Sequence, residues 1–564
     1  MTPEQNSSPI EFYFHYLEQI CPTIVYQEFE AAIAQSVKDV RWDDPKVALD
    51  LNNFAVIALI EAENTGDDSE RKLLLNLAIE ALESGVSQFQ HPLCAAHLAL
   101  TLYLTGESYA AEDIAYQALV DVVQSAYYAP EDPGEPIGLI YFPPLFDRAL
   151  REASIGELFR TTSAHRQALL FLAKTLVITQ PVFYNSRGLR WLELAAGLFP
   201  EAPRINLALG ISKLQNRQAE GLLYLHRAQQ SDPAAPEVLQ ALSLAYRDRG
   251  DLKNADLWKT IACACQLPTT ETSAEWRWTD MDLDSSITYI NYDHCVLAIE
   301  PSFNSIVTSV LLAQGDWFER EMEFWRIWLK PGMTVLDIGA NVGVYTASAA
   351  QRVGSEGRVI AIEPYAPCIT CLEETKRLNH FDSVTIYEGA VSSQSGTAHL
   401  QLHPASELNE IVLNGNGSPV ATAHTATVRC TTLDELMFRE ELTRVDFIKL
   451  DAEGHELDIL AGGSQMLAVF QPTILYENIA GSKGSNLAVA NTLRAIGYKL
   501  YRYQPYLKEL VLLPSNSDLQ GLLNVIAIHP SQYDTVIALG YANADLADEA
   551  ALAELLMVTD TSEL

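Results

Sequence analysis

The sequence is short of positive charge. Lys and Arg together number 37 among 564 residues, against 73 Asp and Glu, so the formal charge is −36 at pH 7. A nucleic-acid backbone is bound by clustered cationic side chains, and anionic lipid surfaces attract the same side chains. The composition therefore disfavours both kinds of partner, and we predict that the protein binds no nucleic acid.

Long apolar runs are also missing, and we expect no secretory leader. No uninterrupted apolar run reaches the ~18 residues that a membrane-spanning helix needs. The first residues, Met1-Thr-Pro-Glu-Gln-Asn-Ser-Ser8, lack the basic region of a secretory signal. The eight cysteines are scattered through a chain far too large for a disulfide scaffold. We therefore expect a cytoplasmic protein with reduced thiols and no membrane span.

The first half of the chain is dominated by helical periodicity, with Ala and Leu recurring at helical spacing up to about Pro268. Two segments, starting at Pro92 and Pro236, align with each other. Both place a small residue at the eighth position, Gly at the fifteenth and Ala at the twentieth: Ala99, Gly106 and Ala111, and Ser243, Gly250 and Ala255. A weaker copy starts at Pro203, 33 residues before Pro236, close to the period of about 34 of a tetratricopeptide repeat. The segments resemble that repeat, and the alternative is a non-repetitive helical bundle.

The second half changes to strand-like patterns. Residues 286–292 and 295–299 alternate β-branched and aromatic side chains, which predicts a hairpin or a small sheet, and an aromatic-rich amphipathic helix follows at 316–329. Seven apolar runs then alternate with helical stretches: 335–338, 359–362, 384–387, 447–450, 473–476, 498–501 and 524–528. This order predicts a parallel sheet with helices on both faces, an α/β fold.

A glycine turn follows the first of these strands, in the run Val335-Leu-Asp-Ile-Gly-Ala-Asn-Val-Gly343. Gly339 permits a turn that a side chain would obstruct, and Gly343 lets the next helix pack closely. Ligands of open α/β sheets bind at this carboxyl edge, where Asp337 can accept a hydrogen bond. The dinucleotide fingerprint would need glycine at the positions of Asn341 and Val344, so a phosphate-free nucleoside such as S-adenosylmethionine fits better.

The second strand ends on an acid that suits a ribose. Glu363 lies 24 residues after Gly339 in the run Val359-Ile-Ala-Ile-Glu-Pro364, near the spacing of about 20 residues at which an acid binds ribose hydroxyls. The alternative is a salt-bridged strand end. The predicted cofactor residues are Asp337, Gly339, Ala340, Asn341, Gly343, Glu363, Pro364 and, at the end of the third strand beside the adenine, Ala390.

These runs, together with Gly315-Asp-Trp-Phe-Glu319 and Val445-Asp-Phe-Ile-Lys-Leu-Asp-Ala-Glu-Gly-His-Glu456, make residues 315–529 resemble the FkbM family of methyltransferases. The resemblance implies a Rossmann-like, seven-stranded domain that binds S-adenosyl-L-methionine and methylates an oxygen of a sugar or small molecule. The predicted domains are a tetratricopeptide-repeat-like helical region at 1–270, a hairpin and helix lead-in at 271–330, the methyltransferase domain at 331–530 and an acidic tail at 531–564.

The acceptor site is expected at the end of the fourth main strand. A hydroxyl acceptor must lose its proton to a base within hydrogen-bond reach, and the predicted catalytic residues are Asp451, Glu453, His455 and Glu477. His455 has a suitable intrinsic pKa, but the family resemblance leaves that position variable. Asp451 has the alternative role of helix N-cap. Asp451 and Glu453 could hold Mg²⁺ with a vicinal diol, yet no motif demands it, so the sequence predicts no metal site.

Three functions compete. The leading prediction is an O-methyltransferase for a hydroxyl of a sugar, glycan or secondary metabolite. The second is an interaction protein whose helical repeats bind a protein partner while the methyltransferase-like region is auxiliary. The third, a nicotinamide-linked dehydrogenase, is disfavoured by Asn341 and Val344.

Overall fold

The computed structural model describes residues 9–20, 29–37, 45, 47–128, 137–143, 158–159, 164–180, 182–266, 273–412, 425–479 and 484–541. The chain forms two compact units, residues 1–213 and 214–564. This division lies within a helix and before the boundary predicted at residue 270. The three helices between residue 214 and residue 270 therefore belong to the same compact unit as the predicted methyltransferase domain.

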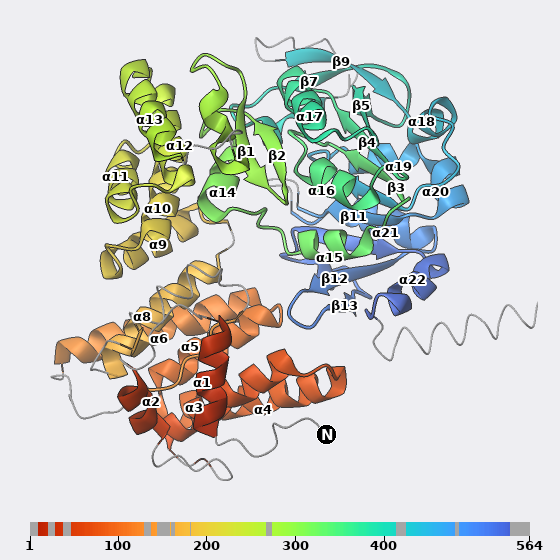
Figure 1. Ribbon diagram of the computed structural model, residues 1–564. Helices are drawn as coiled ribbons and strands as arrows, with labels where there is room; N and C mark the ends of the chain where they lie inside the picture. The colour runs from red at the N-terminus through yellow and green to blue at the C-terminus, as the bar shows by residue number, and fades with distance from the viewer. Residues whose placement is uncertain are drawn as a thin grey trace, which may run out of the picture. The chain divides into compact units, whose positions relative to one another are not determined.

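The first unit is helical, as predicted (Figure 1). Its elements are α1 (Pro9–Ile20), α2 (Glu30–Val37), α3 (Ala48–Asn64), α4 (Asp68–Phe89), α5 (Pro92–Leu104), α6 (Ser108–Tyr128), α8 (Ala164–Ile178), α9 (Ser186–Leu198) and α10 (Pro203–Gln215), the last of which crosses into the second unit. Gly106 has φ +97° in the turn between α5 and α6, and the predicted small residues Ala99 and Ala111 are fully buried. The helix pair is therefore packed as expected, while its membership of the tetratricopeptide family stays a prediction.

An extended segment, residues 137–143, lies buried within this helical unit. Its backbone is bonded by helix side chains rather than by a neighbouring strand. Gln167 of α8 makes two hydrogen bonds to Gly138, accepting from its N–H at 2.8 Å and donating to its carbonyl at 3.0 Å. The remaining bonds come from α1, α3 and α5, through Tyr13, Tyr16, Asn52, Asn53 and His97. Because a buried peptide group without partners is costly, these side chains make the burial possible.

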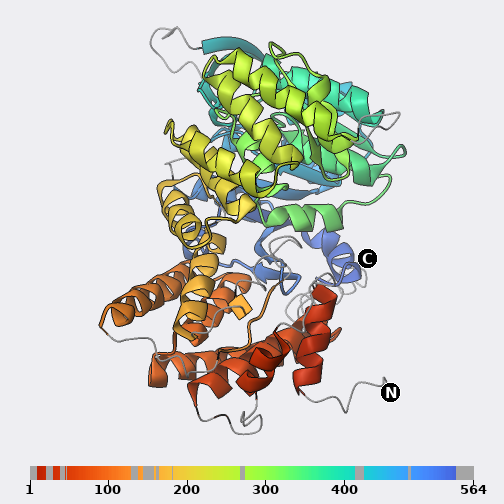
Figure 2. The same cartoon turned by 60° about the vertical axis from the view of Figure 1, so that its left-hand side comes forward.

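The second unit begins with helices that join a hairpin. Helices α11 (Gly221–Ser231), α12 (Pro236–Asp248) and α13 (Leu252–Cys265) are followed by the 3₁₀ helix η2 (Ala274–Asp280), and strands β1 (Thr288–Tyr292) and β2 (Cys295–Ile299) form the predicted antiparallel hairpin. Gln240 of α12 donates to the Tyr289 carbonyl at 2.8 Å. Thr375 of α17 (Ala366–Asn379) accepts from the Ala298 N–H at 2.9 Å. The hairpin thus lies between α12 and α17, as Figures 1 and 2 show.

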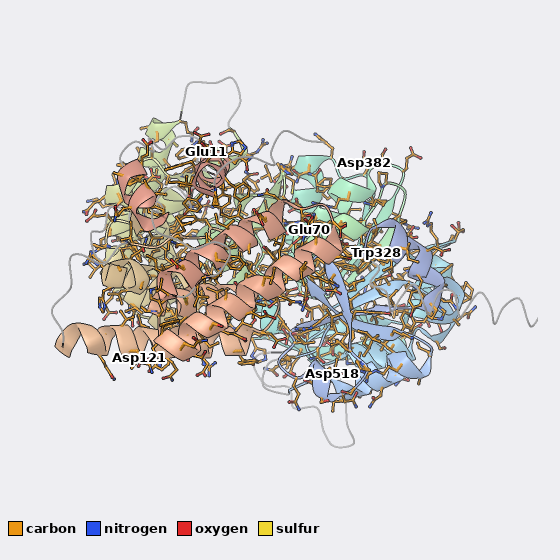
Figure 3. All side chains as sticks on the ribbon, turned by 90° about the horizontal axis from the view of Figure 1, so that it is seen from below. Glu11, Glu70, Asp121, Trp328, Asp382 and Asp518 are labelled. Atoms are coloured by element: carbon orange, nitrogen blue, oxygen red, sulfur yellow. The ribbon has the colours of Figure 1, made fainter. Side chains whose placement is uncertain are left out.

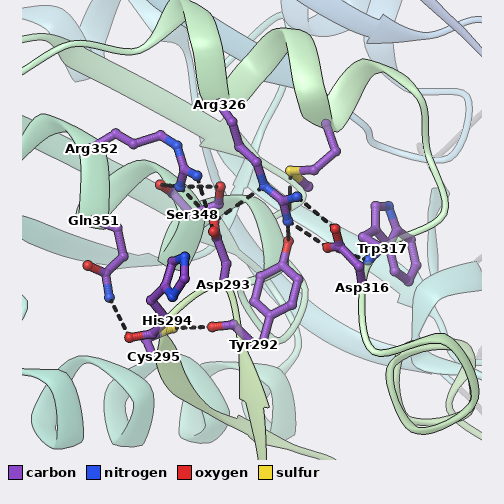
Figure 4. Close-up of polar contacts among 11 residues, drawn as sticks. Tyr292, Asp293, His294, Cys295, Asp316, Trp317, Arg326, Ser348, Gln351 and Arg352 are labelled. Carbon is purple, nitrogen blue, oxygen red and sulfur yellow. Dashed lines mark hydrogen bonds and ion pairs between the residues drawn. The ribbon is translucent and has the colours of Figure 1, made fainter. Parts of the chain in front are cut away.

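The turn of this hairpin is fixed by a cluster of charges (Figure 4). Asp293, in the left-handed conformation, accepts from Arg352 of α16 (Val344–Val353) at 2.6 Å and lies 3.4 Å from Arg326 of α15 (Glu321–Trp328). Arg326 is also bonded to Asp316 at 2.6 Å. The two arginines therefore bind the hairpin turn to both helices.

The main sheet has eight strands in the order β13-β12-β14-β11-β10-β3-β4-β5. They span β3 (Thr334–Ile338), β4 (Arg358–Glu363), β5 (Val384–Glu388), β10 (Phe447–Leu450), β11 (Thr473–Glu477), β12 (Lys499–Gln504), β13 (Glu509–Leu512) and β14 (Asn524–Ile528). All seven predicted strands are present. The five strands from β5 to β11 are parallel, but β14 runs antiparallel to both of its neighbours. The predicted parallel sheet is therefore present from β5 to β11, whereas β14 departs from it at this edge, because an apolar run carries no information about strand direction.

Both faces of the sheet are covered, as predicted. On one face Leu336 and Ile448 join a core with Leu433, Ile459 and Val489, which lie on α18 (Leu433–Arg439), α19 (Glu456–Ala461) and α21 (Leu487–Ala495). On the other face the rings of Trp325 and Phe447 meet edge to face, 4.8 Å apart. The fully buried Phe324 and Trp325 confirm that the aromatic residues of α15 form core.

Some elements differ from the predicted pattern. The helical stretch that follows the strand at 447–450, predicted from the pattern of residues 457–470, forms two helices, α19 and α20 (Ser464–Phe470), separated by Gly462 and Gly463. A second sheet, β6-β9-β7-β8, was not predicted; its strands are Ala390–Val391, Thr425–Thr431, Gly396–Gln401 and Glu410–Val412, with η3 (Ser406–Leu408) between β7 and β8. The turn at 414–419 and the tail from 542 lie outside the described residues. The chain closes on η4 (Ser517–Leu519), η5 (Pro530–Gln532) and α22 (Tyr533–Ala538).

Many of the acidic side chains lie at the surface of each unit. Glu70, Asp121, Asp382 and Asp518 are exposed, whereas Trp328 is buried (Figure 3). Exposed charge of one sign favours solubility and does not determine the fold. Among the described residues, no helix combines the length and the apolar character needed to cross a membrane.

Candidate functional site

The turn after β3 can be made only by glycine at its tightest point. Gly339 has φ +78°, and a Cβ built there would lie 1.7 Å from the Asp451 carbonyl oxygen. Gly343 has φ +100°, and its Cβ would lie 2.6 Å from a Leu372 methyl group. Both glycines therefore bring backbone close to neighbouring elements at the carboxyl edge of the sheet, the edge at which open α/β sheets bind their ligands.

Glu363 lies at the end of β4 against this turn. It is 6% exposed, and its carboxylate accepts the N–H of Asn341 at 2.8 Å and the N–H of Tyr365 at 2.8 Å. Pro364 lies between Glu363 and Tyr365. Burial raises the pKa of Glu363 to about 7, although these two hydrogen bonds oppose the shift. A carboxylate has about four acceptor positions, so Glu363 can still receive ligand hydroxyls.

Asn341 connects the turn to the loop that contains η3. Its φ is +48°, and its side-chain amide lies 3.4 Å from the hydroxyl of Ser406 in η3. The Ser406 hydroxyl donates to Glu300 at 2.5 Å. Ala340 is buried and its N–H donates to the Ile362 carbonyl at 3.1 Å. The turn is thus bonded to β4 and touched by η3.

Asp337 occupies the penultimate position of β3 and is 1% exposed. The Thr346 hydroxyl donates to it at 2.5 Å. Burial raises the pKa of Asp337 to about 6, while Thr346 and Lys449 oppose the shift. Because this carboxylate is enclosed by protein groups, its first role is to join β3 to α16.

Ala390, predicted beside the adenine, begins β6 just after β5. It is buried in a small apolar cluster with Leu400 and Cys430, against which Tyr365 packs. The preceding Gly389 N–H donates to the Glu363 carbonyl at 3.0 Å. Ala390 therefore lies in an apolar cluster close to Glu363, and its place beside the adenine stays a prediction.

Three of the four predicted catalytic residues come together at the adjoining end of β10 and β11. One carboxylate oxygen each of Asp451, Glu453 and Glu477 lies within 4.8 Å of the others. Glu477 is 8% exposed, and its buried Oε2 has no hydrogen-bond partner in the described part of the chain. Burial, followed by the charges of Asp451 and Glu453, raises the pKa of Glu477 well above its usual value.

Lys449 gives this acidic cluster its neighbouring positive charge. Its ammonium donates to Asp451 at 2.8 Å and lies 4.9 Å from the centre of the Tyr345 ring. Burial alone would lower the pKa of Lys449, but the carboxylates of Asp451 and Glu319 raise it. Glu319 accepts from Tyr345 and from Asn524, which lies 205 residues away along the chain.

Glu319, Tyr345 and Asn524 were not predicted as site residues. The only sequence signal for Glu319 was its place in the Gly315-Asp-Trp-Phe-Glu319 run. No signal in the sequence relates it to Asn524, because their contact depends on how β14 is inserted beside β11.

The structure does not bring His455 into the acidic cluster. Its side chain is buried, with Nε2 3.0 Å from the Ser392 hydroxyl and Nδ1 3.6 Å from Asp458. Burial lowers the pKa of His455. The alternative role of Asp451 as a helix N-cap is wrong, because α19 begins at Glu456 and Asp451 instead accepts from Lys449.

Comparison with known proteins identifies the domain around this site. Residues 337–500 match the family model described as the methyltransferase FkbM domain, which confirms the resemblance over that stretch. A relative from Haloferax volcanii, the hexuronic acid methyltransferase AglP, is 28% identical over 131 residues, which cover 23% of this chain and 50% of that protein. The chain thus spans half the length of the curated relative it matches.

Solved structures give weaker likenesses. The methyltransferase FkbM of Methylobacillus flagellatus is 16% identical, covers 40% of this chain and 55% of its own, and has a TM-score of 0.24. A SAM-dependent methyltransferase of Aquifex aeolicus is 18% identical, covers 37% of this chain and 86% of its own, and has a TM-score of 0.20. At these TM-scores the two likenesses carry no functional argument.

Proposed function

Since residues 337–500 match the methyltransferase FkbM domain, we propose that this chain transfers the methyl group of S-adenosylmethionine to a hydroxyl of a sugar or glycan. The observation that carries the proposal is the arrangement at Glu363. Its carboxylate is held by the N–H groups of Asn341 and Tyr365, beside the glycine turn at the carboxyl edge of the sheet. Ribose hydroxyls fit the remaining acceptor positions of this carboxylate.

The cofactor residues of the proposal are those of the turn and of the two following strand ends. Gly339 and Gly343 shape the turn, while Glu363 accepts from the ribose. Ala390 offers an apolar surface for the adenine. A dinucleotide fits less well, because Asn341 replaces the glycine that pyrophosphate requires. When bound, S-adenosylmethionine supplies an electrophilic methyl group and a thioether leaving group.

The acidic cluster is the proposed acceptor site. Asp451 and Glu453 lie at the end of β10, next to the strand that carries the glycine turn. In methyl transfer to oxygen the acceptor must be aligned with the methyl group and must lose its hydroxyl proton. Asp451 and Glu453 are the carboxylates proposed to orient that hydroxyl and receive the proton. Glu477 is the third candidate, and His455 is the least suited, because its ring is buried against Ser392.

The charge of the cluster favours a neutral acceptor. Asp451 and Glu453 together carry more negative charge than Lys449 can balance, and a carboxylate substrate would add to the repulsion. The relative in Haloferax volcanii is named for hexuronic acid, which supports a sugar as the acceptor class here. We infer that this chain prefers a sugar hydroxyl over a sugar carboxylate.

Calorimetry with S-adenosylmethionine tests the cofactor, and a transfer assay tests the acceptor. We expect binding heat with wild-type protein and methylation of neutral sugars at a higher kcat/KM than hexuronic acids. The control variant Glu388→Gln changes an exposed carboxylate at the end of the neighbouring strand β5. We expect it to bind S-adenosylmethionine as the wild type does. An absence of binding heat with the wild type would refute the proposal. Faster methylation of the hexuronic acid would refute the neutral acceptor.

A further inference from the structure

The sequence predicts no metal site, but the fold brings together carboxylates that lie far apart in the chain. Asp451 and Glu453 follow β10, whereas Glu477 ends β11. One oxygen of each lies within 4.8 Å of the others. Oxygen ligands lie at roughly 2.0–2.6 Å from Mg²⁺ or Ca²⁺, so two oxygens on opposite sides of one ion are about 4–5 Å apart. The three carboxylates can therefore share a single ion.

Glu477 provides a second observation that points to a ligand. Its side chain is 92% buried, one of its oxygens has no hydrogen-bond partner in the described chain, and its carboxylate is directed at Asp451 and Glu453. A buried carboxyl oxygen without a hydrogen-bond partner is costly. Such a group is stabilised when it coordinates a cation.

The neighbouring protein cation does not satisfy Glu477. The Lys449 ammonium is bonded to Asp451 at 2.8 Å and lies over the Tyr345 ring. Glu319, which adds a further carboxylate near Lys449, is itself bonded to Tyr345 and Asn524. One ammonium therefore faces several carboxylates, and its ion pair is with Asp451 and not with Glu477.

We propose that Asp451, Glu453 and Glu477 bind one divalent cation of the hard, oxygen-seeking class, Mg²⁺ or Mn²⁺. Three carboxylates leave about half of an octahedral shell open. If the proposed methyl transfer is correct, two oxygens of the acceptor occupy open positions, and the acceptor class narrows to sugars with vicinal hydroxyls. A cation there lowers the pKa of the coordinated hydroxyl and assists loss of its proton. This second part rests on the proposed function, whereas the cation site does not.

Mn²⁺ titration of the full-length protein, followed by calorimetry and by the electron paramagnetic resonance signal of free Mn²⁺, tests the site without turnover. We expect one strong site per wild-type chain. Glu477→Gln keeps the side-chain shape but removes a charged ligand, so it should weaken binding by at least about tenfold. The control Asp382→Asn removes an exposed acid far from the cluster and should bind as the wild type does.

Thermal unfolding shows whether the variant is folded. Without metal, Glu477→Gln should melt no lower than the wild type, because burial beside two acids favours an uncharged side chain at this position. Mn²⁺ at a concentration well above its dissociation constant should raise the wild-type Tm and not that of the variant. The site is refuted if the wild type binds no Mn²⁺ below about 1 mM, a level far weaker than that of ordinary structural or catalytic ions. Equal binding by wild type and Glu477→Gln would refute it as well.

The role of the ion is tested separately from the proposed function. S-adenosylmethionine binding in the presence of EDTA tests the cofactor site alone, and its failure would refute the methyltransferase proposal without bearing on the Mn²⁺ result. We expect that EDTA abolishes methylation of a vicinal diol and that Mg²⁺ restores it. Methylation that is unchanged by EDTA would refute the acceptor-binding role of the ion.

Discussion

Glu363 combines burial with a set of backbone donors that hold its carboxylate in place. The N–H groups of Asn341 and Tyr365 favour the charged form, but burial and the nearby carboxylates of Asp337 and Glu300 outweigh them, so its pKa is raised to about 7. A carboxyl group with a raised folded-state pKa holds its proton more tightly when folded than when unfolded. Glu363 therefore lowers folding stability as the pH rises from about 4.5 to about 7.

This titration predicts a pH-dependent affinity for the cofactor. Protonation of Glu363 leaves its carboxyl group with fewer acceptor positions for the ribose hydroxyls. The dissociation constant of S-adenosylmethionine should therefore rise by up to roughly tenfold from pH 8 to pH 6. Glu363→Gln should bind ~10- to 100-fold more weakly at pH 8, the loss expected for a charged hydrogen bond, and show little pH dependence. Calorimetry at pH 8 and at pH 6 measures the dissociation constant of S-adenosylmethionine for the wild type and for Glu363→Gln. A wild-type constant that does not change with pH would contradict the role of Glu363.

At the scale of elements, the hairpin turn is bound to the domain mainly through one carboxylate. The Asp293 side chain is 6% exposed and lies between Arg352 and Arg326. Burial tends to raise the pKa of Asp293, but the bonds from Arg352 and Ser348 and the charge of Arg326 lower it overall. The charge of Asp293 thus stabilises the fold at neutral pH, and that stability is lost as the pH falls below about 4.

Asp293→Asn should therefore destabilise the protein by about 2–3 kcal/mol at pH 7, somewhat less than a fully buried pair because both arginines are partly exposed. Asn tolerates the left-handed conformation of this position, so the turn itself is preserved. Asp316→Asn serves as the matched control; Asp316 is 52% exposed and should cost less than about 1 kcal/mol. Urea unfolding measures the change in the free energy of unfolding for each of the two variants. Equal losses would show that burial does not distinguish the two carboxylates.

The elements that could be predicted are those whose signal is local. The apolar runs of β3, β4 and β10 and the glycine turn follow from residues next to each other in the chain. The second sheet was missed because its longest strand, Thr425–Thr431, alternates small and polar residues rather than strongly apolar ones. Strand β13 was missed for a similar reason, since it pairs at the sheet edge and is only partly buried.

The candidate site was predictable to the same extent. Glu363 ends β4 and Asp451 directly follows β10, two strands with clear apolar runs. That both residues lie at the same edge of the sheet therefore follows from its topology. The positions of Glu319 and Asn524 beside Lys449 depend on long-range packing that neither sequence neighbourhood records. His455 was placed with the acids by its position in the chain, but the loop from 451 to 455 turns its ring toward Ser392 instead.

At the scale of the whole molecule, helices α11–α13 are part of the sheet-containing unit. Besides the Gln240 bond, Arg247 donates to the carbonyls of Ser285 and Pro301, and Asp248 accepts from the Phe303 N–H. That the helices of the first unit bind a protein partner stays a prediction. The contacts of α11–α13 with the hairpin indicate where the chain can be shortened with the smallest loss of thermal stability.

A chain of residues 216–564 should therefore keep the thermal stability of the second unit, whereas a chain of residues 269–564 should melt roughly 5–10 °C lower. The difference reflects the loss of several hydrogen bonds of about 1 kcal/mol each and of the apolar contacts around them. Differential scanning calorimetry of the two shortened chains provides the comparison. Identical melting temperatures would mean that α11–α13 add nothing to the stability of the sheet domain.

The buried segment at 137–143 has a consequence for how the first unit folds. Stacked helical repeats ordinarily contact only their neighbours and can open one at a time from an end. Here α1, α3, α5 and α8 all donate to or accept from the backbone of one segment, so opening any of these helices leaves a buried peptide group without a partner. Amide protons of Gly138, Leu139 and Tyr141 should therefore exchange with solvent only when the whole helical unit unfolds at once.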